Sequence, residues 1–175
     1  MPWTTPETFT AGQTLTAASM NALSENVDTL REGRPSAVTP MCSATIATTT
    51  GYTQDTDISW TIENYDTDAM FAPTSSTITI KTAGVYLVMF SGRATSTSSA
   101  TYNAVIRLAG ANDAGEEYQD GNKAATSDAR WTMSAVRKLA VNDTVTARLQ
   151  WTGTVTLQGG TTISPTLTAT WLGPG

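Results

Sequence analysis

Apolar residues recur at every second position through most of residues 36–175. In residues 77–81, Ile78 and Ile80 alternate with threonine and lysine, which predicts a half-buried β-strand. The same period of two runs through residues 103–108, 131–135, 144–151 and 166–171, and turn residues such as Ala83-Gly84 and Gly159-Gly160 separate the runs. Eight or more short strands without intervening helices predict a mainly β fold, an antiparallel jelly-roll sandwich.

One of the expected strands, residues 85–90, has apolar residues at both odd and even positions, so that both of its faces are apolar. A strand with two apolar faces is buried on both, either between two sheets or against another subunit. The residues that we expect in the core or at a trimer contact are Val85, Tyr86, Leu87, Val88 and Phe90.

A short helix is predicted over residues 17–32, with Thr16 as its N-cap and with Gly33 and Pro35 ending it. Four apolar residues on one face are spaced three, four and three positions apart, as in two heptads of a coiled coil. This oligomerisation seam consists of Met20, Leu23, Val27 and Leu30. A helix this short is marginal alone, so its seam packs either on its own domain or, as we favour, on other copies around an axis.

The first thirteen residues carry Trp3, Pro6 and Phe9 but have no helical or strand period. Such an arm either folds back on its own domain or docks on a partner through its aromatic side chains. The predicted organisation is therefore an attachment arm at 1–13, a helical neck at 14–35 and a jelly-roll domain at 36–175.

Composition narrows the function classes. The chain of 175 residues carries a net charge of -5 and only 14% charged residues, so we expect no nucleic-acid partner and no anionic-membrane partner. It has no histidine and a single cysteine, Cys42, which excludes histidine-based catalysis and a cysteine zinc site. No apolar run approaches the ~20 residues that cross a bilayer, and the first residues lack the features of an export signal.

Acidic residues gather in three segments that we interpret as loops. Oxygen ligands at this spacing could hold Ca²⁺, but none of the segments matches an EF-hand, so solvated loop acids are the favoured interpretation. No carboxylate pair or Ser-x-x-Lys motif stands out for catalysis, and the prediction is no enzyme, no metal and no cofactor. The acids are Asp55, Asp57, Asp66, Asp68, Asp113, Glu116, Glu117 and Asp120.

Large aromatic side chains on the alternating strands have two interpretations. They could stack on sugars if they are exposed, but on such strands they are more often core or interface residues. These residues are Tyr102, Tyr118, Trp131 and Trp151. Cys42 is expected in a first strand, where a lone thiol is buried by default.

Three short motifs between Phe71 and Val88 resemble the core of the C1q/tumour-necrosis-factor (TNF) superfamily. They read FAP at 71–73, ITI at 78–80 and AGVYLV at 83–88. In that superfamily a Gly-x-Tyr sequence opens a central strand after a turn that contains proline. The resemblance implies a ten-stranded jelly-roll sandwich that packs as a tight homotrimer, with the short helix in place of the collagen-like stalk that many members carry.

The two ends of the chain are similar to small virion structural proteins of tailed bacteriophages. Between Trp3 and Leu30 the similar positions read WTTP…F…G…LTAA…MN…L…N…L, and residues 167–174 read LTATWLGP. The resemblance implies that the arm attaches the protein to the major capsid protein or to tail proteins of the same virion. It also implies a virion location, after assembly in the host cytoplasm, with the jelly roll projecting outward.

Three hypotheses about function follow. The first is a trimeric, non-enzymatic virion protein that decorates the outer surface of a phage particle, as a capsid decoration or head-fibre protein. The alternative is a tail-tip or minor tail protein that contacts host surface glycans. The third is a free-standing carbohydrate-binding or signalling trimer outside any virion.

Overall fold

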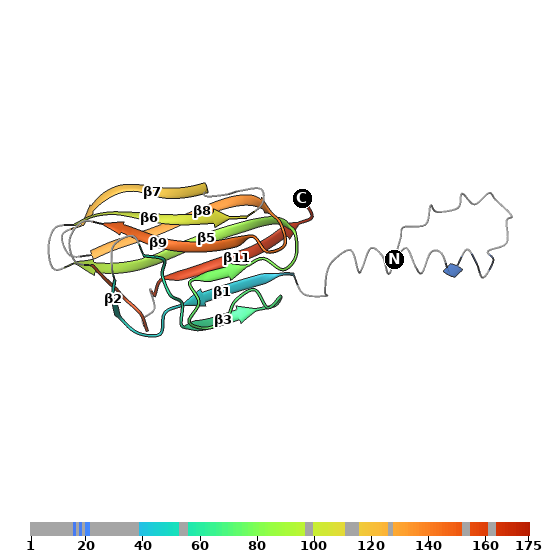
Figure 1. The fold of residues 1–175 in the computed structure, drawn as a ribbon, viewed down its shortest axis with the longest axis horizontal. Coiled ribbons are helices and arrows are strands. Elements are labelled where there is room, and N and C mark those ends of the chain that lie inside the picture. Colours follow the sequence, from blue (N-terminus) through green and yellow to red (C-terminus); the bar gives the residue numbers. More distant parts are fainter. Residues whose placement is uncertain are drawn as a thin grey trace. The chain divides into compact units, whose positions relative to one another are not determined.

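The computed structural model describes residues 16, 18, 20–21, 39–52, 56–96, 100–110, 116–125, 128–151, 155–160 and 164–175. The chain divides into two compact units, Met1–Thr39 and Pro40–Gly175. The described part of the second unit contains eleven strands (Figure 1). They are β1 (Met41–Thr45), β2 (Thr50–Tyr52), β3 (Ile62–Asp66), β4 (Thr77–Thr79), β5 (Gly84–Ser96), β6 (Ala100–Ala109), β7 (Glu116–Ala125), β8 (Asp128–Leu139), β9 (Thr144–Trp151), β10 (Val155–Leu157) and β11 (Thr166–Gly173).

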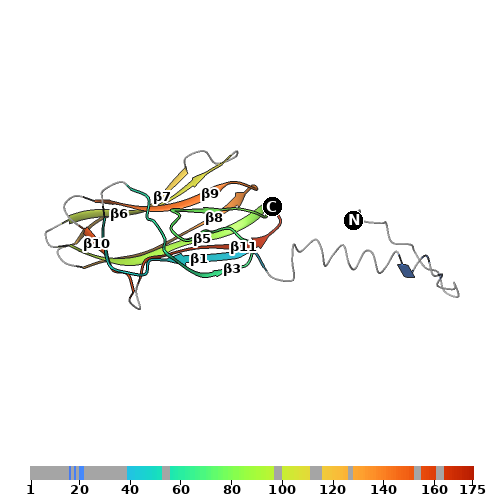
Figure 2. The ribbon, with the colours of Figure 1, turned by 60° about the horizontal axis from the view of Figure 1, so that its bottom comes forward.

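The strands form two antiparallel sheets that pack face to face (Figures 1 and 2). In the first sheet, the long strand β5 pairs with β8 on one side, and with β11 and β10 on the other. This sheet continues from β11 through β1 to β3, and from β10 to β2. The second sheet has the order β4-β9-β6-β7. The expected mainly β antiparallel sandwich is therefore confirmed.

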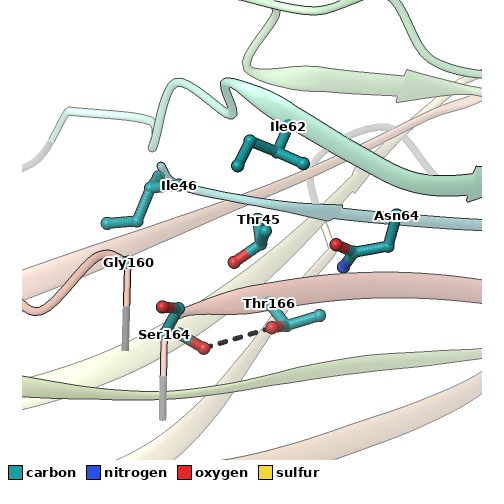
Figure 3. Close-up of a pocket in the computed structure, with 7 residues that line it drawn as sticks. All are labelled: Thr45, Ile46, Ile62, Asn64, Gly160, Ser164 and Thr166. Atoms are coloured by element: carbon teal, nitrogen blue, oxygen red, sulfur yellow. Dashed lines mark hydrogen bonds between the residues drawn. The ribbon is translucent and has the colours of Figure 1, made fainter. Parts of the chain in front are cut away.

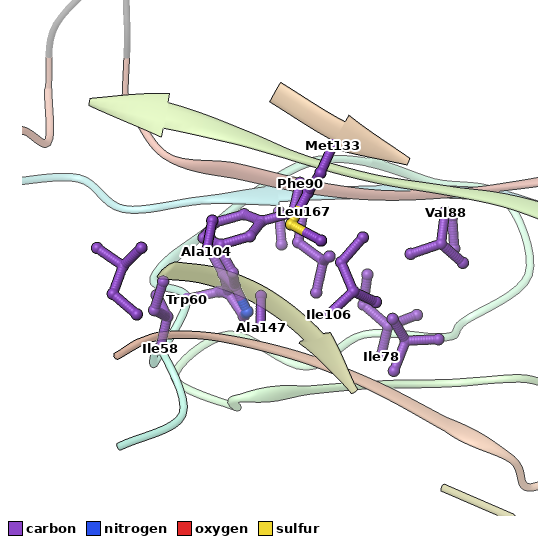
Figure 4. Packing of buried hydrophobic residues seen from close by; sticks show 14 of the residues in the cluster. Ile58, Trp60, Ile78, Val88, Phe90, Ala104, Ile106, Met133, Ala147 and Leu167 are labelled. Carbon is purple, nitrogen blue, oxygen red and sulfur yellow. The ribbon is translucent and has the colours of Figure 1, made fainter. Parts of the chain in front are cut away.

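The core between the sheets is built by the period of two seen in the sequence. In β9 every second residue is buried, and Val145, Ala147 and Leu149 have no exposed surface. Residues of the first sheet, such as Phe90 and Leu167, meet residues of the second, such as Ile106, in one cluster (Figure 4). Alternation along a strand places one set of side chains inward, which is why the sequence pattern located these strands correctly.

The Gly-x-Tyr motif has a clear packing reason. A Cβ on Gly84 would lie against Nε1 of Trp171 and within 2.6 Å of the carbonyl oxygen of Gly173, so only glycine fits beside the end of β11. Two residues later, Tyr86 is fully buried and its hydroxyl donates a hydrogen bond of 2.7 Å to the carbonyl of Thr82. The motif therefore fixes the corner at which the central strand begins.

Two expectations about the acidic segments are wrong. Glu116, Glu117 and Asp120 do not lie in a loop: residues 116–125 form β7, which pairs with β6. Cross-strand pairing overrides the low strand propensity of acidic residues and glycine. Asp66 is the last residue of β3, not a loop residue. Asp55 and Asp113 lie outside the described residues.

The first unit is described only at Thr16, Ala18, Met20, Asn21 and Thr39. Ala18, Met20 and Asn21 are helical, and the amide of Met20 donates to the carbonyl of Thr16 at 3.0 Å, the bond expected of an N-cap residue. Among the described residues, no helix has the length and apolar character needed to cross a bilayer. The boundaries of the arm and the neck stay predictions.

Candidate self-association surface

Strand β5 has one buried face and one partly exposed face. Tyr86, Val88 and Phe90 point into the sandwich and have no exposed surface. Val85 and Leu87, on the opposite face, are half-buried, and Met89 is 38% exposed. The second apolar face of this strand, which the sequence predicts to be buried, is thus left partly open by a single copy of the chain.

Around Leu87 and Met89, the neighbouring strands extend this open face as an uncharged band. Across the sheet, Leu87 lies between Val136 of β8 and Thr170 of β11. Met89 lies in the same way between a serine and a threonine. Val136 is 51% exposed, which is unusual for a valine in the middle of a long strand. We call this surface the association face; it consists of Val85, Leu87, Met89, Ser134, Val136, Thr168 and Thr170.

Charge is confined to the border of the association face. At one end, Lys138 of β8 is exposed and directly opposite Val85. At the other end of the β5–β8 pair, Arg93 and Arg130 are directly opposite each other. Asp128 holds them together, since its carboxylate lies 2.8 Å from Arg93 Nε and 3.4 Å from Arg130. The hydrogen bond from Arg93 holds the pKa of Asp128 below its usual value. Depletion of charge at the centre with charged residues at the rim is the pattern of a protein–protein contact.

A hollow lies on the same sheet, over β1, β3 and the start of β11 (Figure 3). Its volume is about 320 Å³. None of the described residues that line it carries a charge. Its lining consists of Thr45, Ile46, Ile62, Asn64, Gly160, Ser164 and Thr166.

An ionic cluster lies on the second sheet. Arg148 of β9 contacts Asp57 through two nitrogens, Nε at 2.9 Å and Nη2 at 2.8 Å, and Arg107 of β6 approaches the other carboxylate oxygen at 3.8 Å. The amide of Ile58 also donates to the carbonyl of Ala147 at 2.8 Å. These contacts attach the segment before β3 to the second sheet, so the cluster has a structural role.

The described acids do not gather into a metal site. Within the described ranges, no group of three or more acidic or cysteine side chains is close enough to hold an ion. The Asp66 carboxylate instead accepts the amides of Asp68 at 3.0 Å and Phe71 at 2.7 Å, which closes the turn after β3. The Asp57 carboxylate is held by Arg148.

The aromatic residues considered for sugar stacking belong to the core. Trp131 and Trp151 are 3% exposed and Tyr102 is 5% exposed, while the Tyr102 hydroxyl donates to the carbonyl of Arg130 at 3.0 Å. The side chain of Tyr118 lies outside the described residues. The interpretation of these strand aromatics as core residues is therefore confirmed for the three that are described.

Cys42 is fully buried in β1, as expected. Burial raises the pKa of its thiol to about 12, and the nearby carboxylates of Asp66 and Glu63 act in the same direction. The thiol is therefore a packing group and not a nucleophile.

The other predicted sites cannot be compared with the structure. Trp3, Pro6 and Phe9 of the arm, and Leu23, Val27 and Leu30 of the seam, lie outside the described residues. Met20, the first seam residue, is 52% exposed. Attachment through the arm and association through the seam remain predictions.

Sequence reasoning missed Val136 and the hollow. Val136 follows Thr132 and Ser134 at the alternate positions of β8 that face outward. A valine in this polar series could have indicated an exposed apolar residue. The hollow had no such signal, because its walls come from segments far apart in the chain: the Thr45 hydroxyl donates to the carbonyl of Pro165, 120 positions away.

Comparison with known proteins identifies the fold. No family model matches the sequence, and no curated protein matches it. Among solved structures, the globular domain of zebrafish complement 1qA is similar with a TM-score of 0.59 and 13% identity, over 78% of this chain and 99% of that one. Murine APRIL is similar with a TM-score of 0.57 and 12% identity, over 77% of this chain and 100% of that one.

A third similar structure is Eiger TNF from S. frugiperda, with a TM-score of 0.56 and 16% identity, over 78% of this chain and 95% of that one. The chain thus has a C1q/TNF-like jelly roll, and the jelly-roll fold implied by the FAP, ITI and AGVYLV motifs is confirmed. The described residues form eleven strands, where the resemblance implied ten. At this level of identity the likeness concerns the fold alone. None of these three similar structures is a bacteriophage protein.

Proposed function

We propose that the chain is a non-catalytic binding module that assembles as a homotrimer through the association face. The observation that carries the proposal is that three apolar side chains, Leu87, Met89 and Val136, are partly open in one copy and lie within an uncharged band. Apolar surface of this kind gains free energy when a partner removes it from water, at roughly 25 cal/mol per Å². The C1q/TNF likeness adds support, because the resemblance implies a tight homotrimer.

The test is sedimentation of the purified full chain at micromolar concentration, where we expect a trimer. Val136→Glu places a charge in the centre of the association face and should yield monomers, since an unpaired charge buried at a contact costs about 3–5 kcal/mol. Val141→Glu is the matched control: Val141 is 50% exposed, close to the 51% of Val136, but lies in the turn between β8 and β9.

Circular dichroism should show the same strand content for both variants, which separates loss of assembly from loss of folding. A wild-type chain that sediments as a monomer would contradict the proposal. Equal dissociation of the trimer by Val136→Glu and Val141→Glu would show that the loss of assembly does not depend on the association face.

We further propose that the trimer is a structural protein of a tailed-phage virion and decorates the particle surface through its arm. The support is the sequence likeness at Trp3–Leu30 and at residues 167–174, since an arm with Trp3 and Phe9 needs a surface to pack against. Its partners would be the major capsid protein or tail proteins, and many copies on one particle would raise the avidity of weak surface contacts.

Deletion of residues 1–13 is expected to abolish incorporation into particles and to leave the trimer intact. Electron microscopy of particles labelled with an antibody to the jelly roll would show whether the protein lies on the head or at the tail. Unchanged incorporation after the deletion would argue against attachment through the arm.

A second candidate is a tail-tip or minor tail protein that contacts host surface glycans. The uncharged hollow lined by hydroxyl and amide groups favours it, because neutral sugars are recognised by such groups. Tail labelling in the same micrographs would support this candidate over capsid decoration.

A further inference from the structure

The hollow over β1, β3 and β11 has the size of a small ligand site. Its volume of about 320 Å³ lies at the lower end of the roughly 300–1,000 Å³ range of ligand pockets. Ile46, which is 4% exposed, is the most deeply buried apolar residue of its lining, whereas Ile62 is 40% exposed at its side. The side chains of Thr45, Ile62, Asn64 and Thr166 surround the same space (Figure 3).

The hydrogen-bonding state of the lining restricts what can bind. A threonine hydroxyl has one proton, and both lining threonines use theirs internally. Thr45 Oγ1 donates to the carbonyl of Pro165 at 2.7 Å, and Thr166 Oγ1 donates to the carbonyl of Ser164 at 3.1 Å. Both hydroxyl oxygens therefore have only lone pairs left to offer a ligand.

Asn64 adds another acceptor in a fixed position. Its Nδ2 donates to Ser43 Oγ at 3.1 Å, so the amide is anchored and its Oδ1 is the acceptor that remains. Thr45 and Thr166 are directly paired across β1 and β11, whereas Asn64 lies at an irregularity in the β1–β3 pairing and is positioned by its bond to Ser43. No carboxylate, ammonium or guanidinium group is present among the described lining residues, so neither an anion nor a cation finds a counter-charge.

We propose that this hollow binds a neutral sugar unit. A sugar ring presents several O–H donors to the acceptors of Thr45, Asn64 and Thr166, and its apolar C–H face packs against Ile62. The inference deepens the second candidate function, but it does not depend on the trimer, because the hollow and the association face are tested by separate measurements.

The test is titration of the isotope-labelled full chain with galactose, rhamnose and N-acetylglucosamine, followed by the backbone amide shifts in NMR. A single sugar unit makes few contacts, so we expect saturable shifts centred on Thr45, Asn64 and Thr166, with a Kd in roughly the millimolar range. Glucuronate, which is similar in size but charged, is expected to bind more weakly.

Thr166→Val keeps the shape of the side chain but removes its acceptor, so it should weaken binding by roughly tenfold. Thr45→Val should have a similar effect and provides a second variant should the first fail to fold. Thr144→Val is the matched control: Thr144 is half-buried like Thr166, and its hydroxyl also donates to a carbonyl at 3.1 Å, that of Ala109. It lies on β9 and does not line the hollow, so the Kd of this variant for the sugar should stay within roughly twofold of wild type.

Three results would overturn the assignment: no saturable shift with any of the neutral sugars, tighter binding of glucuronate than of the neutral sugars, or equal weakening of sugar binding by Thr166→Val and Thr144→Val. Sugar binding by a chain that sediments as a monomer would sustain this inference and contradict the trimer. A chain that sediments as a trimer but binds no sugar would support the trimer and contradict the sugar site.

Discussion

Single residues with an unusual environment define the corner at which β5 begins. Gly84 has no room for a Cβ beside Trp171, and the Trp171 indole nitrogen donates to the carbonyl of Ala83 at 3.2 Å. Tyr86 is fully buried and closes the turn through its hydroxyl bond to Thr82. The sequence motif and the packing therefore agree at this corner, which joins the central strand to the end of the chain.

Gly84→Ala is expected to destabilise the protein by about 1–3 kcal/mol, because the added methyl group must displace Trp171 or the backbone at Gly173. Thermal unfolding measures the effect, with a loss of roughly 2–4 °C per kcal/mol. Gly51→Ala is the control, since nothing lies within 4 Å of the position of its Cβ. An equal decrease in melting temperature for Gly84→Ala and Gly51→Ala would mean that crowding at the corner does not cause the destabilisation.

Cys42 is expected to resist thiol reagents in the folded protein. Burial raises its pKa to about 12, so at mildly alkaline pH the thiolate that reacts is almost absent, and the strand blocks access. A thiol-reactive chromophore should label the native chain slowly and the guanidinium-unfolded chain at once. Rapid labelling of the native chain would show that β1 opens without global unfolding.

At the scale of elements, long antiparallel pairing decides what is strand and what is loop. β5 and β8 pair over twelve residues, from Gly84↔Leu139 to Thr95↔Asp128. β7 has an acid-rich, glycine-containing sequence with weak strand character, yet it pairs with β6 along its length. Strand propensity is context-dependent, and the partner strand supplies the context here.

The β5–β8 pair should show a defined dependence on pH. The pKa of Asp128 is depressed by the hydrogen bond from Arg93, so the pair stabilises the fold fully above the ordinary aspartate pKa of 3.8. The stabilisation by the Asp128–Arg93 ion pair is lost as pH falls through the lower pKa that Asp128 has in the folded state. Asp128→Asn should therefore reduce the free energy of unfolding by under ~1 kcal/mol at neutral pH, because the pair is partly exposed.

The measurement is denaturant unfolding of both proteins from neutral to strongly acidic pH. The difference in the free energy of unfolding between wild type and Asp128→Asn should vanish at strongly acidic pH, and it should become smaller in high salt. A difference that stays constant with pH would show that the charge of the Asp128 carboxylate does not contribute to the stability.

At the scale of the whole molecule, the two surfaces proposed for assembly belong to different units. The association face belongs to Pro40–Gly175, whereas the predicted seam beginning at Met20 belongs to Met1–Thr39. The second unit has its own continuous hydrophobic core. The routes can therefore be separated by truncation.

A chain that starts at Pro40 is expected to keep its strand content and to remain trimeric at micromolar concentration. The reason is that the association face lies entirely on β5, β8 and β11, which the truncation does not touch. Circular dichroism and sedimentation check the two parts of this expectation. A folded but monomeric product would show that the helical seam, and not the association face, drives assembly.

The sequence by itself determined the strands whose inner face is strictly alternating, such as β9 and β11, because burial on one side of a sheet selects every second residue. It also determined the C1q/TNF-like fold through short motifs around Gly84, and the burial of Cys42, Trp131 and Trp151.

Only the tertiary structure decided that residues 116–125 are a strand and that Val136 is exposed beside Leu87. It alone brought Thr45 and Asn64 together with Thr166 around one hollow. These features depend on which strands become neighbours and in what register. Pairing between segments more than a hundred positions apart has no counterpart in the local period of the sequence.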